Sequence, residues 1–304
     1  MSAAELNEIH PFAGDLRVNA NLFVALRGAF PEDLDRTAIE TADGPGAPRF
    51  YTWRDLDRAS ARMANLLDSL RLPPESRIAV QTDKSVEALM LYLAVLRAGH
   101  IYLPLNTAYM SDEISYFIGN AEPAVVVCSP KNFGWISKLA FKAGTQNVLT
   151  LGDDLSGSLL ERAAQHSDHH LPAQRKAGDL AAILYTSGTT GRSKGAMLTH
   201  GNLLSNALTL KAYWGWRRPD QGGDVLIHAL PVFHAHGLFV ASHGALLAGA
   251  RMLWFNKFDP RATIAQMVRA TVFMGVPTLY VRMLAEPSLT RQACATMRIF
   301  IAGS

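Results

Sequence analysis

The feature that most constrains the fold of this chain is an alternation of short, β-branched apolar runs with longer stretches of helical period. The run Arg77–Gln81, for example, leads into Ser85–Leu96, where apolar residues recur at helical spacing before Gly99. Strands that alternate with helices in this way are typical of βαβ units and a largely parallel sheet. In the second half we predict strands at Leu180–Tyr185, Asp224–Ala229, Ala250–Phe255, Thr271–Val276 and Met297–Ile301. The chain is therefore predicted to be an α/β protein.

Hydrophobic residues make up 49% of the 304 residues, which is enough for a large buried core. A polar stretch between Gln165 and Asp179 predicts a surface linker and approximate subdomains at 20–165 and 179–304. The final residues, Ile299–Ser304, predict a strand that breaks into a glycine turn. Because ligands of such sheets bind at the carboxyl ends of the strands, we expect the chain to be truncated there.

Charge and cysteine content exclude several classes of protein. The 29 basic and 26 acidic residues are spread along the chain without a basic block, so no nucleic-acid partner is predicted. Cys128 and Cys294 form no metal or disulfide pattern, which favours a reducing compartment and a cytoplasmic location. The most apolar region, Val225–Phe255, is interrupted by four histidines and an arginine, so we predict no membrane span. The oligomeric state is not indicated.

A glycine-rich segment, Tyr185–Gly195, directly follows the predicted strand Leu180–Leu184. Three glycines allow backbone amides to point inward, hydroxyl groups add donors, and Lys194 adds a cation, which together suit a polyphosphate. We therefore predict that this loop binds ATP. The candidate ligands are Thr186, Ser187, Gly188, Thr189, Thr190, Gly191 and Lys194.

Three other interpretations of this segment are a Walker loop, an ordinary flexible loop and the nucleophile elbow of a serine hydrolase. It is not a Walker loop, because Gly191 is followed by Arg-Ser-Lys and not by Lys-Ser or Lys-Thr. An ordinary flexible loop would explain the glycines but not the junction with a buried strand. Gly191–Gly195 also matches the Gly-x-Ser-x-Gly elbow of serine hydrolases, although Ser193 lies well beyond the strand end where that nucleophile belongs.

The segment Tyr185–Gly195 resembles the phosphate-binding signature of the adenylate-forming superfamily. This superfamily contains acyl-CoA synthetases, firefly luciferase and the adenylation domains of peptide synthetases. Three further segments resemble its later motifs: Leu230–Gly237 the second motif, Met274–Thr278 the third, and Ile301–Ser304 the start of the turn that contacts adenine. The resemblance extends from about Leu22 to the last residue.

The resemblance implies the large amino-terminal domain of the adenylate-forming fold, with two parallel-rich sheets flanked by helices, ending before the barrel and the carboxyl-terminal domain. It implies an ATP-dependent acid–thiol ligase that forms an acyl-adenylate and then an acyl-CoA, using ATP, Mg²⁺ and coenzyme A. Thr189 is the implied magnesium contact, and Gly303 and Ser304 the implied contacts to the nucleotide. Since the family's later elements are missing, we expect little activity from this chain. A nucleotide-binding remnant without catalysis is the alternative.

His234 lies where the resemblance places an aromatic residue or a histidine beside the bound carboxylate, so it is the candidate catalytic residue, and His236 a second substrate contact. A core histidine bonded to a backbone carbonyl is the alternative for each. A metal site at His234, His236 and His243 is disfavoured, because no acidic residue lies between Asp224 and Asp259.

Arg282 indicates which class of carboxylic acid is the substrate. Pro277 is expected to open a helix after a strand, which places Thr278 and Arg282 on one face at the usual edge for ligands. An arginine there can pair bidentately with a second carboxylate. The runs Leu230–Leu238 and Gly275–Arg282 resemble malonyl-CoA synthetases most, so malonate or methylmalonate is predicted. The alternative is a surface arginine.

Overall fold

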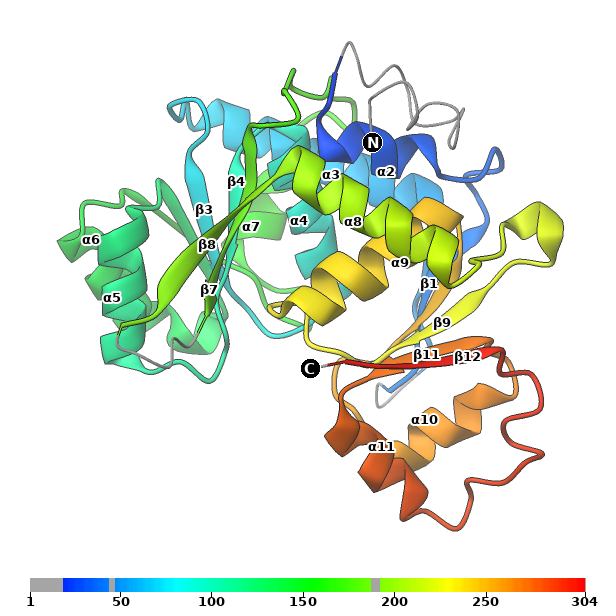
Figure 1. Cartoon of the computed structure of the whole chain (residues 1–304). Helices are drawn as coiled ribbons and strands as arrows, with labels where there is room; N and C mark the ends of the chain where they lie inside the picture. Colours follow the sequence, from blue (N-terminus) through cyan, green and yellow to red (C-terminus); the bar gives the residue numbers. More distant parts are fainter. Residues whose placement is uncertain (1–18, 44–46, 187–191, 304) are drawn as a thin grey trace. The chain divides into compact units, whose positions relative to one another are not determined.

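The computed structural model of the chain describes residues 19–43, 47–186 and 192–303. The chain divides into two compact units, the first formed by residues 1–25 and 57–204 and the second by residues 26–56 and 205–304. Figure 1 shows the helices and strands of both units along the chain. Among the described residues, no helix is long and apolar enough to cross a membrane.

The first unit is built on a six-stranded sheet with the strand order β6-β5-β3-β4-β7-β8. The first five strands in this order run parallel to one another, and β8 runs antiparallel to β7 at one edge. The strands are β3 (Arg77–Gln81), β4 (Ile101–Pro104), β5 (Val125–Cys128), β6 (Asn147–Thr150), β7 (Leu180–Thr186) and β8 (Lys194–Thr199). Its helices are α4 (Val86–Arg97), α5 (Ser111–Ala121), α6 (Phe133–Lys142) and α7 (Ser158–Ala163).

Helix α4 shows why a continuous apolar run becomes a helix here. All twelve of its residues are buried, including Glu87 and Arg97 near its two ends, and the stretch 88–96 between them is apolar on every side, as expected for a core helix. Ser85 caps its start, because its side chain accepts a hydrogen bond from the amide of Ala88 at 3.1 Å. The helix therefore belongs to the core of the first unit and supports the strands on either side of it in sequence.

The second unit holds a six-stranded sheet with the order β12-β11-β9-β10-β1-β2, in which only the β1–β2 pair is antiparallel. The strands are β1 (Thr37–Thr41), β2 (Phe50–Thr52), β9 (Val225–His228), β10 (Arg251–Trp254), β11 (Val272–Gly275) and β12 (Ile299–Ala302). Its helices include a π-helix (His236–Ser242), α9 (His243–Ala248), α10 (Pro260–Met267) and α11 (Pro277–Leu284). Helices α2 (Leu22–Gly28), α3 (Trp53–Ser69) and α8 (His200–Tyr213) each contain a unit boundary.

Helices α10 and α11 cover one face of the second sheet (Figure 1), where their apolar side chains join a core around Phe273. The predicted α/β class with two parallel-rich sheets flanked by helices is thus confirmed. Every strand predicted in the second half is present with slightly different ends. The strand β8 was not predicted, because none of its residues is buried and its sequence lacks an alternating apolar pattern.

The polar stretch between residues 165 and 179 lies inside the first unit and does not separate the two units. Arg97, only 7% exposed, donates to the carbonyl of His170 at 2.6 Å and to the carboxylate of Asp57 at 2.8 Å. The imidazole Nε2 of His170 lies 2.9 Å from the carboxylate of Asp68. The compact units therefore differ from the predicted subdomains 20–165 and 179–304, because these long-range contacts tie the polar stretch to the first sheet and its helices.

Candidate functional site

The predicted phosphate loop connects two strands that are paired with each other in the first unit. β7 ends at Thr186 and β8 begins at Lys194, and these two residues are register partners in the antiparallel pair. Both side chains are exposed, so the loop begins and ends at one edge of the sheet with a hydroxyl and a cation open to a ligand. Five predicted ligands, Ser187, Gly188, Thr189, Thr190 and Gly191, lie outside the described residues, and so does the predicted magnesium contact at Thr189.

The serine-hydrolase interpretation requires that Ser193 sit on a sharp turn between a strand and a helix. Ser193 instead leads directly into the strand β8, with Lys194 as the first strand residue. The carbonyl of Ser193 accepts a hydrogen bond from the hydroxyl of Tyr116 at 2.8 Å. The strand–turn–helix geometry that exposes a hydrolase nucleophile is therefore missing at this serine.

In the second unit, His234 lies in the turn between β9 and the π-helix. The backbone amide of Leu238 donates to its carbonyl at 3.0 Å, while its imidazole is exposed and meets the Phe233 ring edge-on, with 4.6 Å between the ring centroids. Partial desolvation lowers the pKa of His234 below its ordinary value, so the ring is neutral at neutral pH. A neutral imidazole can still donate one hydrogen bond to a carboxylate or an acyl-adenylate oxygen.

His236 opens the π-helix and contacts the turn that follows β12. Its Nδ1–H donates to the carbonyl of Gly303 at 3.3 Å, because a carbonyl oxygen can only accept. Desolvation lowers the pKa of His236, and the bond to Gly303 raises it by a smaller amount. The structure thus brings together two predicted site residues that are distant in sequence, whereas Ser304 lies outside the described residues.

A buried network beneath these histidines was not predicted. The carbonyl of Gly237 accepts from the hydroxyl of Ser242 at 2.9 Å and lies 3.0 Å from Nε2 of His228. The His228 ring, 1% exposed, stacks on Trp254 with 4.5 Å between the ring centroids. π-Helical turns are rare and occur frequently at functional sites, and no local sequence pattern indicates them. The network holds the first turn of the π-helix that carries His236.

His243 is fully buried next to Phe239, and burial lowers its pKa to about 3. It therefore belongs to the core. In the described part of the chain, no group of three histidine, cysteine or acidic side chains is arranged to hold a metal ion.

Helix α11 begins at Pro277 directly after β11, as predicted. Thr278 and Arg282 are both exposed on it, and the Arg282 guanidinium lies 4.9 Å from the centre of the Phe258 ring. Of the carboxylates in the described residues, none lies within ion-pair distance of Arg282. The guanidinium is therefore held by an aromatic face with its hydrogen-bond donors directed to solvent. Lys194 belongs to the first unit, and His234, His236, Gly303 and Arg282 belong to the second.

The two parallel-rich sheets flanked by helices match the amino-terminal domain of the adenylate-forming fold. The chain superposes on the crystal structure of ATP-bound MatB from Rhodopseudomonas palustris with a TM-score of 0.87 and 51% identity, covering 94% of this chain and 55% of that one. The profile of the AMP-binding enzyme family matches residues 29–304, and the chain belongs to this family. The predicted family resemblance is therefore confirmed.

The curated relatives include CoA synthases and CoA ligases. A feruloyl-CoA synthase of Amycolatopsis sp is 30% identical over 255 residues, covering 83% of this chain and 49% of the relative. A mitochondrial malonate–CoA ligase of Bos taurus is 27% identical over 245 residues, covering 77% of this chain and 40% of the relative. The chain thus spans about half the length of the curated relatives that it matches.

Proposed function

We propose that the protein is the AMP-binding part of an acyl-CoA synthetase that acts on malonate or methylmalonate and uses ATP, Mg²⁺ and coenzyme A. The observation that carries the proposal is the β7–β8 hairpin, which places Thr186 and Lys194 side by side at the two ends of the phosphate loop. The 51% identity to ATP-bound MatB and the malonate–CoA ligases among the relatives support it.

The proposed reaction has two balanced steps. A carboxylate oxygen of the acid bonds to the α-phosphorus of ATP while the bond to pyrophosphate breaks. The thiolate sulfur of coenzyme A then bonds to the acyl carbon, and AMP leaves with the oxygen. Lys194 would neutralise phosphate charge, and neutral His234 would donate to the acyl oxygen, so the chain acts by positioning and charge stabilisation.

Arg282 supports a dicarboxylic substrate within this proposal, because its exposed guanidinium has donors available beyond the Phe258 ring.

We also propose a cytoplasmic location, without a membrane or nucleic-acid partner. The two described cysteines are both free, with Cys128 buried and Cys294 half-buried, which suits a reducing compartment.

Lys194→Ala is expected to weaken ATP-dependent pyrophosphate exchange by about ten- to a hundredfold, because a hydrogen bond to a charged group contributes roughly 1.5–3 kcal/mol. The measurement uses a fusion enzyme in which this chain is followed by the carboxyl-terminal part of R. palustris MatB. Lys142→Ala, at the exposed end of α6, is the matched control and should leave exchange unchanged. Parental exchange in the Lys194 variant would contradict the loop assignment.

Arg282→Ala is expected to lower malonate turnover in the fusion enzyme by about ten- to a hundredfold, while turnover of propionate or butyrate changes little. Only a dicarboxylate loses a charged partner in this variant. Arg282→Lys should fall between the two, because a lysine keeps the charge but not the bidentate geometry. Arg261→Ala on the neighbouring helix α10, where the arginine is already paired with Glu286, is the control. An equal loss on both kinds of acid would show that Arg282 is structural.

A further inference from the structure

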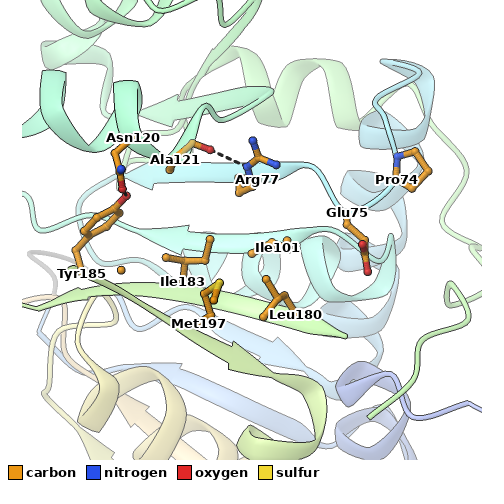
Figure 2. A pocket seen from close by; sticks show the side chains of 11 residues that line it. Pro74, Glu75, Arg77, Ile101, Asn120, Ala121, Leu180, Ile183, Tyr185 and Met197 are labelled. Carbon is orange, nitrogen blue, oxygen red and sulfur yellow. Dashed lines mark hydrogen bonds between the residues drawn. The ribbon is translucent and has the colours of Figure 1, made fainter. Parts of the chain in front are cut away.

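The strand β7 leads into the phosphate loop at Tyr185, and this end of the loop is held by helix α5. The Tyr185 hydroxyl donates to the side-chain oxygen of Asn120 at 2.5 Å, and Figure 2 shows the two side chains facing each other at one end of a pocket. The Tyr185 ring also packs on Phe117, with 4.4 Å between ring centroids, and is 8% exposed. The loop entry is therefore anchored to α5 by one hydrogen bond and one aromatic contact.

The exit of the loop is held by the same helix. The hydroxyl of Tyr116 donates to the backbone carbonyl of Ser193 at 2.8 Å, immediately before β8 begins. The guanidinium of Arg192 lies over the Tyr116 ring, 5.6 Å from its centre. The backbone on the exit side is thus restrained by a bond to a main-chain atom, which is insensitive to the identity of residue 193.

Tyr116 and Asn120 are four residues apart in α5 and share one face of the helix. The opposite face buries Ile114, Ile118 and Ala121 in the core of the first unit, so the helix is a rigid support. Its carboxyl end is further held by Arg77, whose Nε donates to the carbonyl of Ala121 at 2.7 Å (Figure 2). Contacts from one rigid helix face therefore reach both ends of the loop.

A pocket lies beside these contacts, on the same face of the β7–β8 pair as α5 (Figure 2). A pocket of about 480 Å³ is lined by Asn120, Tyr185 and Gly195, together with Ile183 and Met197 of the two strands. Gly195 pairs with Tyr185, and a Cβ at Gly195 would meet a methyl group of Ile183 at 2.8 Å. The Tyr185 side chain borders this pocket, and its hydrogen bond and ring contacts are made with α5.

We propose that Tyr116 and Asn120 are positioning residues that fix the strand ends on either side of the phosphate loop, and with them Thr186 and Lys194, for the binding of ATP. The proposal rests on the proposed function of the loop. Side chains whose backbone is already held lose less conformational freedom when they bind phosphates, so ATP binds more tightly. Removing either contact should therefore raise the KM for ATP more than it changes kcat.

Trypsin cleavage measures this restraint without enzymatic activity of the protein. Trypsin cuts after arginine and lysine, and Arg192 and Lys194 flank Ser193, whose carbonyl accepts the bond from Tyr116. In the 304-residue chain without ATP, Tyr116→Phe is expected to speed cleavage after Arg192 or Lys194 by about three- to tenfold, because it removes only the hydroxyl. Asn120→Leu should act similarly, and Asn120→Asp, which keeps an acceptor oxygen, should restore parental cleavage. Tyr109→Phe removes a hydroxyl from the same aromatic cluster without a contact to the loop, so it is the matched control.

Equal cleavage in the Tyr116 and Tyr109 variants would overturn the proposal, as would a Tyr116→Phe variant whose unfolding temperature falls and whose cleavage rises at every tryptic site. In the fusion enzyme, Tyr116→Phe should raise the KM for ATP about three- to tenfold and leave kcat within about twofold. A fall in kcat with an unchanged KM would also overturn it. ATP should slow trypsin cleavage of the parental chain at these two sites. If ATP has no such effect but the Tyr116 and Tyr109 variants still differ in cleavage rate, the loop does not bind ATP, whereas the role of α5 in holding its ends is supported.

Discussion

Asp224→Ala is expected to be among the most destabilising substitutions in the second unit. Asp224 is 2% exposed and binds Arg298 through both carboxylate oxygens, at 2.7 and 3.1 Å. The hydroxyl of Thr271 and the amide of Arg217 donate to the same carboxylate, each at 2.7 Å. The carboxylate therefore ties together the segments that precede β9, β11 and β12. Its removal leaves a largely buried guanidinium without its partner, which costs about 3–5 kcal/mol.

The free energy of unfolding, from urea denaturation, measures this cost. Asp220→Ala is the matched control, because Asp220 lies nearby, is 74% exposed and approaches Arg218 only to 3.7 Å. The control should change stability by less than about 0.5 kcal/mol. If the two variants have the same free energy of unfolding, the pair of Asp224 with Arg298 does not stabilise the second unit.

Acid provides a second measurement of the same contact. Burial by itself raises the pKa of Asp224, but hydrogen bonds from Arg298, the Arg217 amide and Thr271 outweigh it, so the folded pKa is lowered. The stabilisation is then fully present above the unfolded pKa of about 3.9 and is lost as the pH falls through the lower, folded value. The stability difference between parent and Asp224→Ala should therefore shrink below about pH 4.

Gly237→Ala is expected to damage both the stability of the second unit and the histidine site. A Cβ at this position would meet the carbonyl oxygen of Pro231 at 2.0 Å and its carbon at 2.8 Å. Both are backbone atoms of the turn that carries His234, so the clash moves the main chain. Overpacking of this kind costs about 1–3 kcal/mol, and the shift should separate His236 from Gly303.

The measurement combines thermal unfolding with pyrophosphate exchange in the fusion enzyme, which should fall at least about tenfold since misplacement by about 1 Å can cost a hundredfold. Gly134→Ala in α6 is the control, because a Cβ there meets nothing within 4 Å. It should be neutral or slightly stabilising, as alanine is the better helix residue. A Gly237 variant with parental stability and activity would show that the turn and the π-helix adapt without cost.

Local chemistry made several elements predictable. Asp259 and Pro260 predict a helix start, and in the structure the Asp259 carboxylate accepts from the amide of Ala262 at 2.8 Å. Pro277 opens α11 for the same reason, because a proline suits the first helical turn. Thr52 and Asp55 have the spacing of a capping box, and the structure shows its reciprocal bonds, from the Thr52 amide to the Asp55 carboxylate at 2.8 Å and from the Asp55 amide to the Thr52 hydroxyl at 3.1 Å. Each of these signals depends on neighbours within four residues.

Long-range contacts were not predictable in the same way. The strand β8 exists because β7 pairs with it, although none of its residues is buried and its sequence is weakly patterned. The π-helix depends on His228, which reaches the carbonyl of Gly237 from β9, and on Ser242, which donates to the same carbonyl from the last position of the π-helix. The hold of Tyr116 on Ser193 joins residues 77 positions apart. None of these pairings leaves a periodic pattern in the chain.

The sequence by itself determined the α/β class, five strands of the second half and several helix starts, because hydrophobic periodicity, caps and glycine-rich turns act over a few residues. The tertiary structure decided which distant residues meet: His236 with Gly303, Asp224 with Arg298, and α5 with both ends of the loop. It also decided that the polar stretch near His170 belongs to the first unit. Such contacts form only when packed elements bring side chains within hydrogen-bond distance, and that distance is set by the whole fold.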